Sequence, residues 1–448
     1  MRRAKFRRVG AIACALTLAP LAACGGGGGA GDSGSQGKTQ IVYRLWDKEQ
    51  KQRYQKIVAA FEKKHSNIDV KIELLPWSAY WKKLTTEAAA GTAPDVFKVL
   101  PSRFATYVRK GMLMDLSPVV EKHGIDSGAY REIAWKSYQY KGKMYAIPAD
   151  QGVQVMYYNK DLFKKVGVTM PDKLTWDPQG SGSFVALMKK LTVDKQGRHP
   201  GEPGFDPKHV KRWGFASWNH FGSQWSNWVR DNGGRLIDHP YGKWTLDGPK
   251  SVEALTWAVD LITRWHVSPP ASMTNPPSGQ ATEMFQRGQV AVFPGSNALV
   301  SFIAPDSNFD IGVAKMPVGP AGRFSSSHGA GEVVFAGTDH PEAAKKFVAF
   351  LGSKQARRVT ASAGGSIPAI KSLAPLYVKY WKSKGVDMSP ATGQMSAGAT
   401  FAVPVVANYD ASVGEIKPVL NQMYLGQLSP KEATDRAVRE ANDAISSG

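Results

Sequence analysis

The chain has 448 residues, a formal net charge of +20 and 42% hydrophobic residues, which allows two domains with a large buried core. Its Lys and Arg residues are scattered and match no aromatic-basic motif, so the charge does not indicate a nucleic-acid-binding protein. We expect this charge to favour solubility and contact with an anionic cell envelope.

The N-terminal segment predicts an export signal. Five cations precede an apolar run, residues 9–23, that is shorter than the roughly 20 residues of a membrane span. The run ends in Leu21-Ala22-Ala23-Cys24, which resembles the lipobox of bacterial lipoproteins. That resemblance implies that residues 1–23 are removed and that Cys24 carries diacylglycerol, which anchors the protein to the extracytoplasmic face of the cytoplasmic membrane. The alternative is a soluble exported protein cut by the ordinary signal peptidase.

The residues after Cys24 predict a tether. Cys14 lies in the removed segment, so the mature chain would keep one cysteine and no internal disulfide. Glycines 25–29 and a Gly/Ser-rich stretch follow, and we expect residues 24–38 to act as a flexible, lipidated linker.

The first part of the folded chain alternates strand and helix patterns. Residues 41–46 predict a strand, residues 70–75 a second strand, and residues 93–97 the start of a third. This rhythm favours an α/β fold with a largely parallel sheet covered by helices. Between the first two strands, one apolar face of a helix is formed by Tyr54, Ile57, Val58 and Phe61.

A second lobe is expected to begin near residue 150, because a turn and an extended crossing precede a strand at residues 153–158. Residues 180–249 show little periodicity, and we expect long loops on one face rather than sheet core. Pro249 predicts the first turn of a helix on which Trp257 and Trp265 are assigned to the core. The expected apolar stripe of that helix is Val252, Leu255, Val259 and Ile262.

Two more helix starts are visible near the C-terminus. His340-Pro341-Glu342 opens a helix that carries Phe347, Val348 and Leu351. Ser429 and Glu432 form a capping box at the start of the last helix.

The order of eight segments resembles the extracellular solute-binding proteins of ABC importers, in the sugar-binding branch related to maltose-binding protein. The segments are residues 41–64, 91–96, 111–116, 142–148, 156–163, 284–291, 340–347 and 365–368. The resemblance implies a two-lobed α/β periplasmic-binding-protein fold of type II, with a cleft between lobes that hinge crossings join. The crossings are expected near residues 148–151, 329–333 and 376–382. Lobe one would hold residues 39–149 and 331–378, and lobe two residues 150–330 and 379–448.

The same resemblance implies a function in transport. The chain would be a monomeric substrate-binding lipoprotein that captures a mono- or oligosaccharide by hinge closure and delivers it to the transmembrane subunits of an ABC permease. It would need no cofactor and no metal, bind no nucleic acid, and carry out no catalysis.

A sugar presents apolar C–H faces and a ring of hydroxyls, so its site needs aromatic platforms and polar groups that donate and accept. The expected platforms are Trp46, Trp77, Trp218, Phe221 and Trp225.

The expected polar and hinge residues lie at strand ends and crossings. From the resemblance we expect Asp47, Arg103, Asp150 and Gln151 to contact the ligand. Asn297 stands where many relatives carry Trp, which puts a maltodextrin ligand in doubt. The remaining expected ligand-binding residues are Gly331, Glu332 and Tyr409.

Two alternatives remain open. A secreted lipoprotein glycosidase would also use an aromatic cleft, but it needs two carboxylates roughly 5–9.5 Å apart and no recognisable acid motif stands out. The same fold could instead bind a glycerol-phosphodiester, a polyamine or a peptide. The sequence has no His-Glu-x-x-His, Gly-x-Ser-x-Gly or Cys-x-x-Cys motif.

Overall fold

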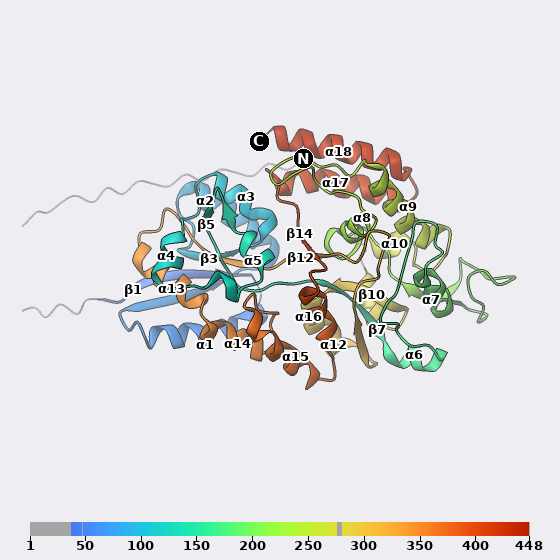
Figure 1. Ribbon diagram of the computed structural model, residues 1–448, viewed down its shortest axis with the longest axis horizontal. Helices are drawn as coiled ribbons and strands as arrows, with labels where there is room; N and C mark the ends of the chain where they lie inside the picture. The colour runs from blue at the N-terminus through green and yellow to red at the C-terminus, as the bar shows by residue number, and fades with distance from the viewer. Residues whose placement is uncertain (1–36, 47, 276–279, 448) are drawn as a thin grey trace, which may run out of the picture. The chain divides into compact units, whose positions relative to one another are not determined.

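Two five-stranded sheets organise the part of the chain that the computed structural model describes, residues 37–46, 48–275 and 280–447. Figure 1 shows β1 and β3 in one lobe and β7 and β10 in the other. Lys38–Gly448 forms one compact unit. The predicted export signal, the lipidation site Cys24 and the predicted ligand residue Asp47 lie outside the described residues.

The first sheet has the strand order β2-β1-β3-β13-β6. β1 is parallel to both β2 and β3, as predicted, whereas β13 joins antiparallel after more than 200 residues of intervening chain. One core beside this sheet includes side chains of α1 and α13, and another includes those of α2 and α3. The bounds are β1 Thr39–Leu45, β2 Ile68–Leu74, β3 Val96–Val99, β6 Ile147–Pro148, β13 Gly331–Val334, α1 Lys48–Glu62, α2 Trp77–Ala90, α3 Pro101–Arg109 and α13 Pro341–Leu351.

The second sheet has the order β11-β7-β10-β9-β8. β7 is antiparallel to β10 and β11, and β9 is parallel to β10. Its two cores include side chains of α9, α17 and α18 in one and of α11, α12, α15 and α16 in the other. The bounds are β7 Gln154–Asn159, β8 Val193–Asp194, β9 Val210–Phe215, β10 Val290–Ser296, β11 Ile311–Ala314, α9 Pro249–Thr263, α11 Ala281–Gln286, α12 Val300–Asp306, α15 Ala374–Lys382, α16 Ser389–Ser396, α17 Tyr409–Tyr424 and α18 Pro430–Ser446.

Several local predictions are confirmed. The four apolar positions predicted on α1 are all buried, and Phe347, Val348 and Leu351 of α13 lie in the same core. The capping box at α18 is present, with the Ser429 side chain accepting from the Glu432 backbone and the Glu432 carboxylate accepting in return. Trp257 and Trp265 are core residues, as assigned.

The prediction of long loops over residues 180–249 is wrong. This region contains α7 (Ser183–Leu191), the sheet strand β9, a π-helix at Phe221–Trp225 and α8 (Ser226–Asp231). β9 reads Val-Lys-Arg-Trp-Gly-Phe, so it lacks the alternation of a half-buried strand, and its place between β8 and β10 is set by tertiary pairing.

The stripe predicted on α9 is rotated. Leu255 is buried as expected, but Val252, Val259 and Ile262 are only half-buried. The buried face also uses the small residues Ala254 and Ala258, because small side chains allow neighbouring elements to pack closely.

Extended segments connect the sheets. Gly152 and Asp150 form bridges to His328 and Pro368, and β12 (Ser325–Ser327) pairs in parallel with β14 (Thr400–Ala402). A Cβ at Gly329 would lie 2.2 Å from the Asp150 carbonyl oxygen, so this approach requires glycine. These segments include residues of the first two expected crossings, and residues 376–382 of the third lie in α15. The hinge positions and lobe boundaries stay predictions.

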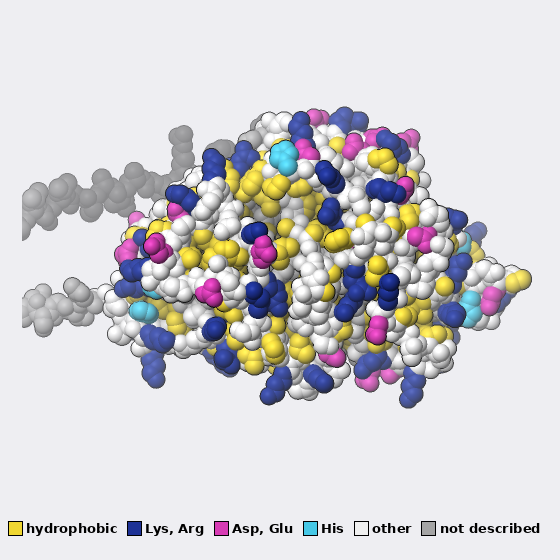
Figure 2. All heavy atoms as spheres, viewed as in Figure 1, with side chains coloured by type: hydrophobic (Ala, Val, Ile, Leu, Met, Phe, Trp, Pro, Cys, Tyr) yellow, Lys and Arg dark blue, Asp and Glu magenta, His cyan; other side chains and the backbone are white. Residues whose placement is uncertain are grey.

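The surface and helix lengths add two observations. Figure 2 shows Lys and Arg side chains spread over the whole viewed face of the described residues. Within the described ranges, every helix is too short or too polar to span a bilayer.

Candidate functional site

A cleft of about 1200 Å³ is lined by residues that belong to both sheets and to the segments between them. Trp46 follows β1 and Trp77 opens α2, so they approach from the first lobe. Trp218 and Phe221 approach from the second lobe, after β9, and Tyr409 enters with the first turn of α17. The structure therefore brings together five of the aromatic residues that the sequence singled out.

The aromatic rings of the first lobe form a cluster. The rings of Trp46 and Trp77 meet edge to face at 5.4 Å, and Trp46 also contacts Tyr80 at 5.1 Å and Trp81 at 5.6 Å. Trp77 is 49% exposed although it is large and apolar. An apolar face left open inside a cleft is characteristic of a ligand platform.

The second lobe contributes a stacked pair. The rings of Trp218 and His220 lie 4.6 Å apart and nearly parallel. The Trp218 Nε1 hydrogen is buried without a hydrogen-bond partner among the described residues. A buried N–H without a partner carries a desolvation penalty. The Trp218 N–H is therefore available to donate a hydrogen bond to a ligand.

Two buried glutamines that line the cleft also have a side-chain oxygen without a hydrogen-bond partner among the described residues. Gln151 is 2% exposed and donates from Nε2 to Ser327 Oγ at 2.8 Å, and Gln154 Nε2 lies 3.2 Å from His328 Nδ1. Neither Oε1 has a partner in the described part of the chain. The cleft thus offers acceptors as well as a donor to a ligand with hydroxyl groups.

Two charged groups, Asp150 and Lys98, also line the cleft. Asp150 accepts from the Ala330 backbone N–H at 2.8 Å and from Ser366 Oγ at 3.3 Å. Lys98 is 2% exposed, donates to Gln50 Oε1 at 2.9 Å, and lies 4.5 Å from the centre of the Tyr54 ring.

Neighbouring groups set the charge of these side chains. Burial lowers the pKa of Lys98, but Tyr54 and the Glu332 carboxylate raise it by more, so its pKa lies above the usual value and it is charged at neutral pH. Burial lowers the pKa of His328, which keeps that imidazole neutral there.

Arg103 lies at the rim instead of the described cleft lining. Its Nε donates to both carboxylate oxygens of Asp410, at 2.9 and 2.7 Å, and its Nη2 donates at 2.7 Å. The guanidinium stacks over the Trp81 ring at 4.1 Å. Because α3 packs in the core of the first lobe and α17 in that of the second, this ion pair joins the two lobes.

Two further predicted ligand residues, Trp225 and Gly331, lie away from the cleft lining. Trp225 is 0% exposed and packs in the core with Phe221, because the π-helix that carries it turns this indole inward. Gly331 is a strand residue of β13 between Val99 and Pro148, where a side chain would collide with the Tyr138 ring. Neither residue lines the cleft.

Glu332 is also placed away from the cleft lining. It is 0% exposed and accepts from Tyr43 Oη at 2.8 Å, Tyr54 Oη at 3.1 Å and Arg357 Nη2 at 3.0 Å. The alternation of β13 turns its side chain into this buried network, so its carboxylate is satisfied by the protein.

Asn297 lines the cleft, but its amide is already bound. Its Oδ1 accepts from the Val153 backbone N–H at 2.9 Å, and its Nδ2 donates to Tyr377 Oη at 3.3 Å. These bonds fix a segment between the sheets and leave less of the amide for a ligand.

Several lining residues were not predicted. Lys98, Gln154 and His328 are buried or half-buried polar residues at strand ends, and Phe302 of α12 is 52% exposed. Lys98 lies just after the segment 91–96 that was used for the resemblance. Its position in the predicted third strand could therefore have indicated that it belongs to the site. No sequence signal indicated Gln154 or His328, because the two side chains meet across more than 170 residues of chain.

Comparisons with known proteins agree with this geometry. The sequence family described as bacterial extracellular solute-binding protein matches residues 47–358. A maltooligosaccharide ABC transporter solute-binding lipoprotein of Streptococcus pneumoniae is 25% identical over 98% of both chains. An arabinooligosaccharide-binding protein of Bacillus subtilis is 25% identical over 91% of this chain and 93% of that one.

Solved structures share the fold. UspC of M. tuberculosis is 30% identical, with a TM-score of 0.78 over 90% of this chain and 100% of that chain. An ABC substrate-binding protein from Listeria monocytogenes in complex with cycloalternan is 25% identical, with a TM-score of 0.77 over 91% of this chain and 99% of that chain. The two-lobed fold with an interlobe cleft is therefore the one that the sequence predicted.

Proposed function

Because the chain belongs to the family of bacterial extracellular solute-binding proteins, we propose that its cleft captures a carbohydrate for an ABC importer. The observation that supports this proposal is the kind of side chain that lines the cleft. Aromatic rings from both lobes face a space in which Gln151 Oε1, Gln154 Oε1 and Trp218 Nε1 are buried without partners among the residues that the structure describes. Sugar C–H faces pack on aromatic rings, and sugar hydroxyls both donate and accept, so one ligand class satisfies both features.

The size of the cleft favours an oligosaccharide. About 1200 Å³ exceeds the upper end of the range of roughly 300–1000 Å³ that is usual for small-molecule pockets. Relatives carry names of arabino-, malto- and galactooligosaccharide-binding proteins, which supports the same class of ligand here.

The residues that line the cleft fit a protein that binds its ligand without reacting with it better than they fit a hydrolase. Asp150 is the one carboxylate among the described lining residues, and a glycosidase needs two. The relatives compared are named as binding proteins. We therefore propose that the protein releases its ligand unchanged.

We also propose that the protein delivers its ligand to a membrane permease. The protein would hold its ligand between closed lobes, present that shape to the transmembrane subunits of a permease, and remain at the membrane through a lipid on Cys24. A relative named as a solute-binding lipoprotein supports the anchor. Ligand drives closure only by binding the closed form better than the open form.

The test is calorimetric titration of the purified protein with arabino-, malto- and galactooligosaccharides. Trp77→Ala and Trp218→Ala each remove an aromatic platform, and specific aromatic packing contributes about 0.5–1.5 kcal/mol beyond the buried area, so we expect the affinity to fall at least about 2- to 13-fold. Phe205→Ala is the matched control, because Phe205 is an aromatic residue outside the cleft lining.

Equal affinity in all three variants would exclude this cleft as the sugar site. Chromatography of the oligosaccharide after prolonged incubation tests the absence of hydrolysis, and shortened products would show an enzyme instead.

A further inference from the structure

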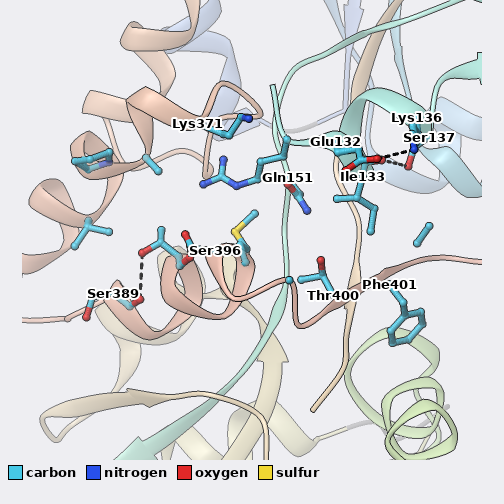
Figure 3. A pocket seen from close by; sticks show the side chains of 18 of the residues that line it. Glu132, Ile133, Lys136, Ser137, Gln151, Lys371, Ser389, Ser396, Thr400 and Phe401 are labelled. Atoms are coloured by element: carbon cyan, nitrogen blue, oxygen red, sulfur yellow. Dashed lines mark hydrogen bonds and ion pairs between the residues drawn. The ribbon is translucent and has the colours of Figure 1, made fainter. Parts of the chain in front are cut away.

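A second groove, of about 1540 Å³, is lined by residues from several helices and from the segment around β14. Figure 3 shows Lys371, Glu132 and Lys136 on one side of it, Ser389, Ser396 and Thr400 on the other, and Gln151 between them. Gln151 also lines the cleft described above, so the two spaces share this residue.

Helix periodicity shows that the groove is a built surface. On α15 the lining positions are Ala374, Pro375, Val378, Lys379 and Lys382, which recur at intervals of three and four residues. One face of α15 therefore points into the groove. The neighbouring helix α16 contributes Ser389, Thr392, Met395 and Ser396, which also recur at intervals of three and four residues.

The charges of the groove do not balance. Five cations line it, and Glu132 is the one carboxylate among the described lining residues. Lys136 forms an ion pair with Glu132 at 2.6 Å. The other four cations form no ion pair in the described part of the chain: Arg131, Lys371, Lys379 and Lys382.

The positive charge of the groove includes a half-buried side chain, Arg131. Its Nη1 donates to the Pro368 carbonyl at 2.8 Å, and the side chain is half-buried. Burial lowers the pKa of Arg131, and no carboxylate offsets that loss. Like charges that share a groove repel each other, and an anion bound there would relieve the repulsion.

Hydrogen-bond donors face the same space. The hydroxyls of Ser389 and Thr400 donate to no partner within the described ranges. Arg supplies several donors in a planar fork and Lys supplies three donors on a point charge, the two groups that proteins commonly use for phosphate oxygens. The apolar side chains Ile133, Val378 and Met395 lie beside them and would contact an organic part of the ligand.

We propose that this groove, formed by α15, α16 and the segment around α5 (Glu132–Lys136), is a second ligand site that binds a phosphate ester. The unpaired cations bind the phosphate, and the apolar wall contacts the organic group. Such a phosphate comes either from a soluble ester or from the headgroup of an anionic lipid.

The test compares two probes on the full chain. Calorimetry with glycerol 3-phosphate, and with glycerol as the uncharged control, measures the soluble source. Cosedimentation with phosphatidylglycerol vesicles, compared with phosphatidylcholine vesicles, measures the headgroup. The groove variant is Lys379→Gln with Lys382→Gln. The matched control is Lys164→Gln with Lys165→Gln, two exposed lysines of α6 (Lys160–Val166) that remove the same charge.

We expect saturable binding of at least one phosphate probe, weakened about tenfold or more in the groove variant and retained in the control, because hydrogen bonds to charged groups contribute about 1.5–3 kcal/mol each. Binding of glycerol 3-phosphate identifies a soluble ester, and binding of the anionic vesicles alone identifies a headgroup. Absence of saturable binding to both probes overturns the proposal, as does equal weakening in the two double variants, since that would reflect net charge. Circular dichroism of both variants verifies that they are folded.

Discussion

Glu332 is a buried residue that is bonded to a side chain of the cleft lining but does not line the cleft itself. Its carboxylate accepts from Tyr43, Tyr54 and Arg357, and Tyr54 itself lines the cleft. Burial raises the pKa of Tyr43 well above its usual value, so the hydroxyl keeps its proton and donates. The network fixes the position of the Tyr54 ring and, through it, the place of Lys98.

Arg357→Met tests the energy of this network. The change leaves a buried carboxylate without its counter-charge, so we expect the free energy of unfolding to fall by about 3–5 kcal/mol. Urea denaturation followed by circular dichroism measures it. Lys164→Met on the surface of α6 is the control, for which we expect little change. A loss below about 1 kcal/mol for Arg357→Met would contradict the assigned role.

At the scale of elements, α3 and α17 meet at the mouth of the cleft. Arg103 is held on one side by the Trp81 ring and on the other by both oxygens of Asp410. Tyr409, next to Asp410, lies in the cleft, so the same turn of α17 provides a rim contact and a lining ring. We infer that this pair holds the lobes together when the cleft is closed.

Asp410→Asn removes the charge of that contact while keeping its shape. Asp410 is 60% exposed, so we expect the pair to contribute about 0.2–1 kcal/mol and its loss to speed ligand dissociation by up to about fivefold. Stopped-flow fluorescence measures the rate. Arg103→Gln should have at least as large an effect, because it also removes the guanidinium from the Trp81 ring, and Asp410→Asn should add little once Arg103 is replaced. Additive effects of the two changes would show that the pair does not act as a unit.

At the scale of the molecule, two sheets with their own cores are joined by extended segments between Ala149 and Val153 and between Ser325 and Gly331. Each lobe can therefore move as a body while few backbone angles change. If the ligand contacts both lobes more fully in a closed form than in an open one, as proposed, binding and closure are linked.

We expect saturating oligosaccharide to reduce the radius of gyration measured by small-angle X-ray scattering. At a ligand concentration of 100 times Kd, the same linkage should add about 2.7 kcal/mol to the free energy of unfolding. Glycerol at matched concentration is the control. An unchanged radius together with tight binding would show that capture needs no closure.

The sequence determined the local elements and the general chemistry of this protein. The apolar spacing of α1, the capping box of α18 and the strand-helix rhythm of the first lobe are short-range patterns, so they could be predicted. The aromatic residues of the cleft were predicted by type, because a sugar site requires such rings.

Tertiary structure alone decided which of those side chains face the cleft. Trp218 and Trp225 are seven residues apart, yet Trp218 lines the cleft and Trp225 is core. Trp225 lies at the end of the π-helix Phe221–Trp225, which turns its indole inward, whereas Trp218 lies before that helix. Gln154 meets His328, and Arg103 meets Asp410, across chain separations of 174 and 307 residues. A side chain's exposure depends on the surfaces that pack against it, and those surfaces come from distant parts of the chain that local patterns do not record.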